Sequence, residues 1–156
     1  MKKIILMTLI ACCSPTALYA DALIYAGVAG GYAESAGSDD AAFGVHVGTG
    51  LIPLIGIEVG FWNFGSFDNF DHKSFYLAAK PSIDFGGFHL FAKLGLNYFD
   101  KTGGPSRSDD GLDVMYGFGA EYFFTDNFST GAGYTSFGFD DEAVNSLTIN
   151  LTFHLL

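Results

Sequence analysis

The feature that most constrains this chain is an alternation, at every second position, of large apolar side chains with small or polar ones. It is clearest over residues 43–51 and 55–62, where Phe, Val, Ile and Leu alternate with Gly, His and Glu. Successive side chains of a strand point to opposite faces, so this period of two predicts strands with one apolar face. The longest uncharged stretch after the first twenty residues, 41–57, contains four glycines and Pro53, which argues against a transmembrane helix.

The alternation recurs along the chain and predicts eight strands, an even number. In the first strand glycine and alanine fall on both faces, so its apolar face is the least defined. The predicted strands cover residues 22–32, 42–51, 54–64, 73–85, 88–99, 112–125, 128–139 and 146–155.

The connections between these strands alternate in predicted length. Three are tight and carry turn-forming residues, at Pro53, at Gly86 with Gly87, and at Asp126 with Asn127. The other four are polar and predicted to be long loops. They cover residues 33–40, 65–72, 100–111 and 140–145. Short turns on one side and long loops on the other are typical of outer-membrane barrels.

The composition also favours a membrane barrel. Aromatic residues make up 17% of the chain and charged residues only 15%, below the usual quarter. Aromatic residues on the apolar face cluster where strands would leave the membrane, as interfacial girdles do. These are Phe85, Phe88, Phe124 and Phe128 beside the tight turns, and Phe61, Phe75 and Tyr98 beside the longer connections.

These features predict the all-β fold class and, within it, an eight-stranded antiparallel up-and-down transmembrane β-barrel. Closure pairs the first strand with the eighth, because lipid offers no partner to an open edge. A soluble extracytoplasmic barrel of the lipocalin type is the alternative, but its large side chains would point inward. The small residues on the opposite face fit a narrow lumen and favour the membrane barrel.

The first twenty residues predict an export signal. They combine two lysines, an apolar run and a small residue, Ala20, at the cleavage position. Residues 21–156 would then form the barrel as a single domain. Residues 9–12 also resemble a lipobox, so lipoprotein processing at Cys12 is the alternative. Cleavage after Ala20 removes both cysteines, and no disulfide or thiol chemistry is then expected.

Five segments carry a resemblance to a known family: YAGVAGGY (25–32), IGIEVGFW (55–62), FAKLGLNYF (91–99), YGFGAEYFFTDNFSTGAGY (116–134) and VNSLTINLTFHLL (144–156). In their order they resemble the OmpA-like and OmpX-like eight-stranded outer-membrane barrels. The resemblance implies an outer-membrane location with both termini in the periplasm, a monomer, and insertion by the barrel-assembly machinery. The chain departs from the family in ending at Leu156 instead of Phe or Trp, which leaves its efficiency of assembly open.

Once the apolar set is assigned to lipid, the strand charges fall on the lumenal face. We predict a lumenal charge network of Glu58, Lys80, Lys93 and Glu121, in which two cations face two anions and fill the narrow barrel. A charge pointing at lipid would instead cost about 1–3 kcal/mol or more. The same face takes Asp113, His46, His89, Asn97, Asn150 and His154.

Two other functions remain open for this barrel. Rearrangement of the lumenal salt bridges would give a gated, low-conductance porin. A lipid A-modifying enzyme is the weaker alternative, for which Asp71, His72 and Ser74 supply the residue types, although the alternation turns Ser74 toward the lumen. No cofactor or metal is expected, because the four histidines lie on different strands and show no ligand spacing.

The long connections are predicted to carry the specific function. They hold 11 acidic residues against Lys101, Arg107 and the adjoining Lys73. This acidity argues against nucleic acid as a partner. It fits an acidic surface bridged to lipopolysaccharide by divalent cations, or a structural or adhesion-like role toward a host or cell-surface ligand. The candidate contact residues are Phe67, Phe70, Asp39, Asp40, Asp109 and Asp110.

Overall fold

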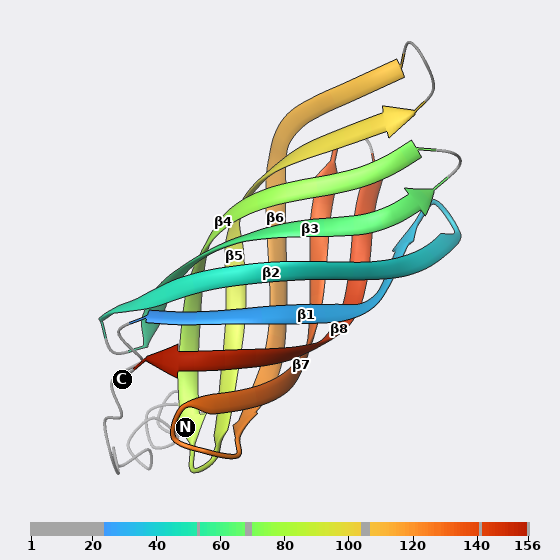
Figure 1. The fold of residues 1–156 in the computed structure, drawn as a ribbon. Coiled ribbons are helices and arrows are strands. Elements are labelled where there is room, and N and C mark those ends of the chain that lie inside the picture. The colour runs from blue at the N-terminus through green and yellow to red at the C-terminus, as the bar shows by residue number, and fades with distance from the viewer. Residues whose placement is uncertain (1–23, 53, 68–69, 104–106, 141, 156) are drawn as a thin grey trace, which may run out of the picture.

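The chain forms one closed antiparallel barrel in which each strand pairs with the next and β1 pairs with β8 (Figure 1). The computed structural model describes residues 24–52, 54–67, 70–103, 107–140 and 142–155. The predictions on residues 1–20, Cys12, Asp68, Asp141 and Leu156 lie outside the described residues. The strands are β1 (Ile24–Ser35), β2 (Ser38–Ile52), β3 (Ile55–Phe67), β4 (Phe70–Phe85), β5 (Phe88–Gly103), β6 (Arg107–Phe123), β7 (Phe128–Phe139) and β8 (Glu142–Leu155).

The predicted all-β fold and strand order are therefore confirmed. No helix in the described part of the chain is long and apolar enough to cross a bilayer. Ile24 pairs with Leu155, so both ends of the described barrel lie together. We call this end periplasmic, as the family resemblance implies, and the opposite end extracellular.

The apolar face predicted from the alternation lies on the outside of the barrel. Phe43, Val45 and Val47 on β2 are exposed, whereas the residues between and beside them, such as Gly44, His46 and Gly48, are buried inside. The predicted girdle aromatics also point outward. Those near the periplasmic turns are Phe85, Phe88, Phe124 and Phe128, and those nearer the extracellular end are Phe61, Phe75 and Tyr98.

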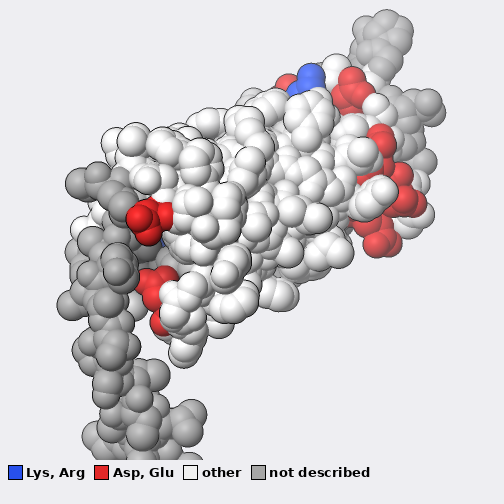
Figure 2. All heavy atoms as spheres, turned by 60° about the horizontal axis from the view of Figure 1, so that its bottom comes forward, with Lys and Arg blue, Asp and Glu red and all other residues white. Residues whose placement is uncertain are grey.

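The outer surface between the two girdles is nearly uncharged. On the face shown in Figure 2, acidic side chains lie at both ends of the barrel and basic ones at one end, and a broad white band separates the two ends. This band is the surface that faces lipid, because hydrocarbon offers charged groups no solvation.

The prediction of four long loops is wrong. The strands continue as paired hairpins through most of those polar residues: Ser35 pairs with Ser38, Phe67 with Phe70, and Phe139 with Glu142. In the first hairpin Ala36 and Gly37 have φ angles of 50° and 83°, as a two-residue turn of the type I′ class requires. The polar residues mark where the chain leaves the lipid, whereas the strand itself goes on.

The interior is divided into two layers, one of which the sequence analysis missed. Toward the extracellular end the lumen contains an aromatic cluster around Phe64, which is fully buried. Its ring lies 5.0 Å from that of Phe137 and 5.9 Å from that of Phe139, and it stacks on Trp62. The cluster comprises Ala33, Ala42, Trp62, Phe64, Phe67, Tyr76, Ala78, Phe99, Met115, Phe137, Phe139 and Val144. The lumen is thus filled by large apolar rings as well as by charges.

Phe67, predicted to be a surface contact, belongs to this cluster, and that prediction is corrected. The β3–β4 register shifts between Asn63 and Ser66, and Gly65 adopts a φ of 77°. This bulge reverses the inward and outward phase of the last residues of β3. As a result Phe67 is only 4% exposed and its ring packs 5.1 Å from that of His72.

The aromatic cluster should carry much of the stability of the barrel. We expect Phe64→Ala to lower the free energy of unfolding by about 3–5 kcal/mol, because it leaves a cavity among rings that cannot close around it. Phe61→Ala on the lipid face, three residues away, should cost less, because lipid chains fill the space. Denaturant unfolding in lipid vesicles, followed by fluorescence of Trp62, the single tryptophan, measures both. Equal losses for the two variants would contradict the internal role of the cluster.

Candidate functional site: the lumenal charge network and the extracellular rim

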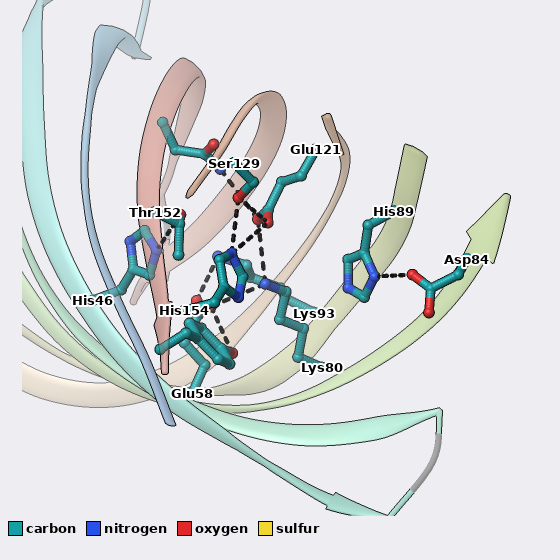
Figure 3. A network of polar contacts seen from close by, with 12 residues as sticks. His46, Glu58, Lys80, Asp84, His89, Lys93, Glu121, Ser129, Thr152 and His154 are labelled. Carbon is teal, nitrogen blue, oxygen red and sulfur yellow. Dashed lines mark hydrogen bonds and ion pairs between the residues drawn. The ribbon is translucent and has the colours of Figure 1, made fainter. Parts of the chain in front are cut away.

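Four neighbouring strands bring the predicted lumenal charges together. Glu58 lies on β3, Lys80 on β4, Lys93 on β5 and Glu121 on β6, all in the inward phase. Lys80 Nζ lies 3.6 Å from Glu58 Oε2 and 3.3 Å from Glu121 Oε1. Lys93 Nζ lies 2.5 Å from Glu58 Oε1. Figure 3 shows the four side chains converging in the lumen, with Lys80 between the two carboxylates.

Glu58 is fully buried, and its charge is balanced by four donors. Besides the two lysines, the Tyr25 hydroxyl donates to Oε2 at 3.1 Å and the Tyr76 hydroxyl donates to Oε1 at 2.5 Å. A buried carboxylate without such partners would carry a large desolvation penalty. The arrangement therefore holds an anion in the middle of the barrel without exposing it to lipid or bulk water.

Glu121 is held by a second set of groups nearer the periplasmic end. It accepts hydrogen bonds from Ser129 at 3.1 Å and from Asn150 at 3.4 Å, and His154 Nε2 lies 4.0 Å from it. Ser129 and His154 also contact each other at 2.9 Å. Glu121 thus joins β4 to β6, β7 and β8 through side chains, across the width of the lumen.

The sequence analysis missed the tyrosines that serve Glu58, although their phase could have revealed them. Tyr76 stands between the lipid-facing Phe75 and Leu77, so its side chain must point inward. Gly48 and Gly60 make room for the rings: a Cβ at Gly48 would collide with Tyr25, and one at Gly60 with Tyr76. Gly48 and Gly60 therefore leave the space in which the two tyrosines reach Glu58.

The two layers are in direct contact through Tyr76. Tyr76 donates to Glu58 and also packs in the aromatic cluster, 6.0 Å from Phe137. On the other side of the network, the Lys80 ammonium lies 4.6 Å from the centre of the Phe91 ring, and that of Lys93 lies 5.2 Å from it. Rings and ion pairs together fill the barrel at this level.

Two of the three residues considered for catalysis, His72 and Ser74, point away from lipid, whereas Asp71 is exposed. His72 and Ser74 are both buried on the lumenal side of β4, and a ring nitrogen of His72 contacts the carbonyl oxygen of Phe70 at 2.9 Å. A hydrolase of lipid A would need its nucleophile at the lipid-facing surface. Among the described residues, no group of three or more His, Asp or Glu side chains is arranged to hold a metal ion.

The candidate contact residues of the extracellular end differ in exposure and in hydrogen bonding. Asp39 and Asp109 are exposed, and Asp110 is exposed while accepting the Tyr98 hydroxyl at 2.6 Å. Phe70 is half-buried. We call the acidic residues around this end, among them Glu34, Asp39, Asp71, Asp109 and Asp110, the acidic rim.

Asp40 has a local structural contact in addition to its place in the acidic rim. The ladder between β2 and β3 ends at Phe43 and Asn63. Beyond it the Asp40 carboxylate accepts the N–H of Ser66 at 2.9 Å and that of Ala41 at 2.7 Å. These hydrogen bonds lower the pKa of the Asp40 carboxyl below its usual range. Asp40 therefore links β2 to β3 beyond the end of their ladder.

The buried charges of the network should be energetically coupled. We expect Glu58→Gln to lower the free energy of unfolding by about 3–5 kcal/mol, because it leaves two lysines in the lumen facing one carboxylate. Adding Lys93→Met should recover part of this loss, because it removes the unpaired cation. Unfolding of the wild type, both single variants and the double variant in vesicles gives the coupling energy. Strictly additive losses would show that Glu58 and Lys93 do not act as a pair.

Comparison with known proteins agrees with this architecture. A family model described as the outer membrane protein beta-barrel domain matches residues 4–154. No curated protein matches the chain significantly.

Several solved structures share the fold. Ail, the attachment invasion locus protein of Yersinia pestis, is 20% identical with a TM-score of 0.61, over 83% of this chain and 95% of Ail. Neisserial surface protein A is 19% identical with a TM-score of 0.59, over 85% and 96%. OprG from Pseudomonas aeruginosa is 14% identical with a TM-score of 0.55, over 86% and 98%. The chain therefore belongs to the outer membrane protein beta-barrel domain family, and its place is the outer membrane.

Proposed function

We propose that this protein is a plugged barrel that acts at the cell surface through its acidic rim, in a structural or adhesion-like role. The observation that carries the proposal is the contrast between the two parts of the molecule. The lumen is filled by the charge network and the aromatic cluster. The hairpins above the outer girdle instead present exposed, mostly acidic side chains to the medium.

The sign of the rim charge selects the chemistry of its partners. A structure of Ail has been solved in complex with the heparin analogue sucrose octasulfate, a polyanion. The acidic rim of this chain would repel such a ligand, so its partners should be cationic, or anionic groups bridged by divalent cations. Binding through bridging divalent cations would suit the phosphates of lipopolysaccharide. We expect the protein to act as a monomer inserted by the barrel-assembly machinery.

Neutralising part of the rim tests this function. Glu34 and Asp39 are exposed and directly opposite each other on β1 and β2, so removing both charges relieves repulsion and should not harm the fold. We expect cells carrying Glu34→Gln with Asp39→Asn to attach more weakly than wild type to immobilised polylysine and to epithelial monolayers. The difference should shrink at high salt, because salt screens exposed charges.

The matched control removes two charges from the periplasmic end, with Asp84→Asn and Asp126→Asn. Attachment of that variant should equal wild type. Attachment that is unchanged in the rim variant, or equally reduced in the control, would remove the support for a surface role of the rim. Attachment that disappears only when divalent cations are chelated would identify the bridged mode.

Gated conduction is the second candidate, and one observation favours it. Lys80 lies within 3.6 Å of Glu58 and within 3.3 Å of Glu121, so a small movement could exchange its partners. The filled lumen nevertheless leads us to expect no steady conductance from the wild type in planar bilayers, and the same from Glu121→Gln. A steady wild-type conductance that changes in Glu121→Gln would overturn the plugged barrel in favour of a porin.

A further inference from the structure

An open groove crosses the outer wall of the barrel near the extracellular ends of β7, β8, β1 and β2. Of these strands, β8, β1 and β2 lie side by side in Figure 1. The groove has a volume of about 190 Å³, whereas pockets that enclose a whole small molecule have about 300–1,000 Å³. Its size therefore fits a headgroup. The side chains that line it include Tyr32, Glu34, Asp39, Tyr134, Asn145 and Leu147.

One side of the groove is apolar and aromatic. Leu147 on β8 is opposite Tyr134 on β7 and opposite Tyr32 on β1, so the three residues form one row across the outer face. Tyr32 is 69% exposed, which leaves its ring accessible to a ligand. Tyrosines are typical of the level at which a bilayer meets water. This side of the groove therefore continues the lipid-facing surface of the barrel.

The other side of the groove carries two neighbouring carboxylates. Glu34 on β1 is directly opposite Asp39 on β2, and both are exposed. Among the described residues, neither of them forms an ion pair. Like charges that face each other across two strands are destabilising, so a bound cation would relieve their repulsion. Elsewhere on the extracellular end Lys73 on β4 stands opposite Asp100 on β5, and there the chain itself supplies a cation.

Asn145 lies between the apolar side and the acidic side. The Tyr134 hydroxyl donates to Asn145 Oδ1 at 2.8 Å, and Asn145 is opposite Glu34 across the β1–β8 ladder. Because Oδ1 already accepts this hydrogen bond, the Nδ2 amide is the part of Asn145 that can serve a ligand, and it is a donor. A donor beside two carboxylates suits a headgroup that carries an oxygen next to an ammonium group.

We propose that this groove binds an outer-leaflet lipid whose headgroup carries a primary amine. In this complex the ammonium lies between Glu34 and Asp39 and over the ring of Tyr32, since carboxylates and aromatic faces both stabilise such a cation. The acyl chains follow Leu147 along the lipid-facing wall. A water-soluble amine gains nothing from the apolar side, and an anionic headgroup is repelled by the carboxylates. The inference goes beyond the surface role proposed above, because this ligand belongs to the protein's own membrane.

Two lipids that differ at the amine test the site. The protein in micelles of a neutral detergent is titrated with a short-chain phosphatidylethanolamine and, separately, with the same lipid acetylated on its nitrogen. Acetylation removes the positive charge and keeps the acyl chains and the phosphate. Native mass spectrometry measures how much of each lipid the protein retains.

We expect the amine lipid to bind at least about tenfold more tightly than its acetylated form, because charge-assisted contacts are the strong ones. Glu34→Gln with Asp39→Asn should abolish this preference. Asp109→Asn with Asp110→Asn removes the same number of rim charges from β6 and should retain it. In nuclear magnetic resonance spectra of the wild type, the side-chain amide of Asn145 should shift with the amine lipid.

The ring of Tyr32 has a test of its own. Tyr32→Leu keeps an apolar side chain in the groove and removes the aromatic face. We expect it to reduce the preference for the amine lipid by about two- to fivefold, the size of an exposed cation–π contact. An unchanged preference in this variant would remove Tyr32 from the site and overturn the proposed position of the ammonium.

Equal binding of the two lipids would overturn the proposal. A preference that survives Glu34→Gln with Asp39→Asn, or that is lost equally in the matched β6 variant, would also overturn it, because the groove would then not be the source. Tighter binding of phosphatidylglycerol that disappears on chelation of divalent cations would assign the groove to metal-bridged phosphate and overturn the amine site. These measurements use no cells, so the attachment experiment decides the surface role separately.

Discussion

Closure of the sheet is the constraint on which the rest of this structure depends. A bilayer core offers no water to an unpaired N–H or C=O, so every strand must find partners on both sides within the membrane. The pairing of β1 with β8 provides this, and it forces the chain to present one face to lipid and the other to a narrow lumen. Every further property of the molecule follows from how these two faces are filled.

The lumen is packed differently at two levels along the barrel axis. Around Glu58 the interior is polar, and the buried charges are balanced by donors from β1, β4 and β5. Above it the interior is mainly apolar and packs around Phe64, with a few buried polar side chains such as His72, Ser74 and Asn97. Tyr76 belongs to both layers, because its hydroxyl bonds to Glu58 while its ring packs against Phe137. That residue therefore joins the two layers.

The fold, the apolar face and the inward phase of the four charges could be predicted from the sequence, because a period of two is preserved across each lipid-spanning strand. The prediction fails where polar residues are taken as loops. The hydrophilic residues 33–40 predict a loop, yet Glu34 and Asp39 stand opposite each other in a paired hairpin. Phe67 was misplaced because the bulge at Gly65 reverses the phase locally, and a period-two pattern cannot show where such a reversal occurs.

The strands leave the lipid before their pairing ends, and this explains how the extracellular end can carry function. Inside the membrane an unpaired strand edge would be too costly to exist, so all seams there must be closed. Above the outer girdle water satisfies the backbone, and neighbouring strands are free to end at different heights. The β2–β3 and β6–β7 ladders stop there, each followed by an aspartate, Asp40 or Asp113, that accepts backbone N–H groups. On this chain β6 extends furthest past its neighbour, because its ladder with β7 stops at Met115 while its ladder with β5 continues to Arg107.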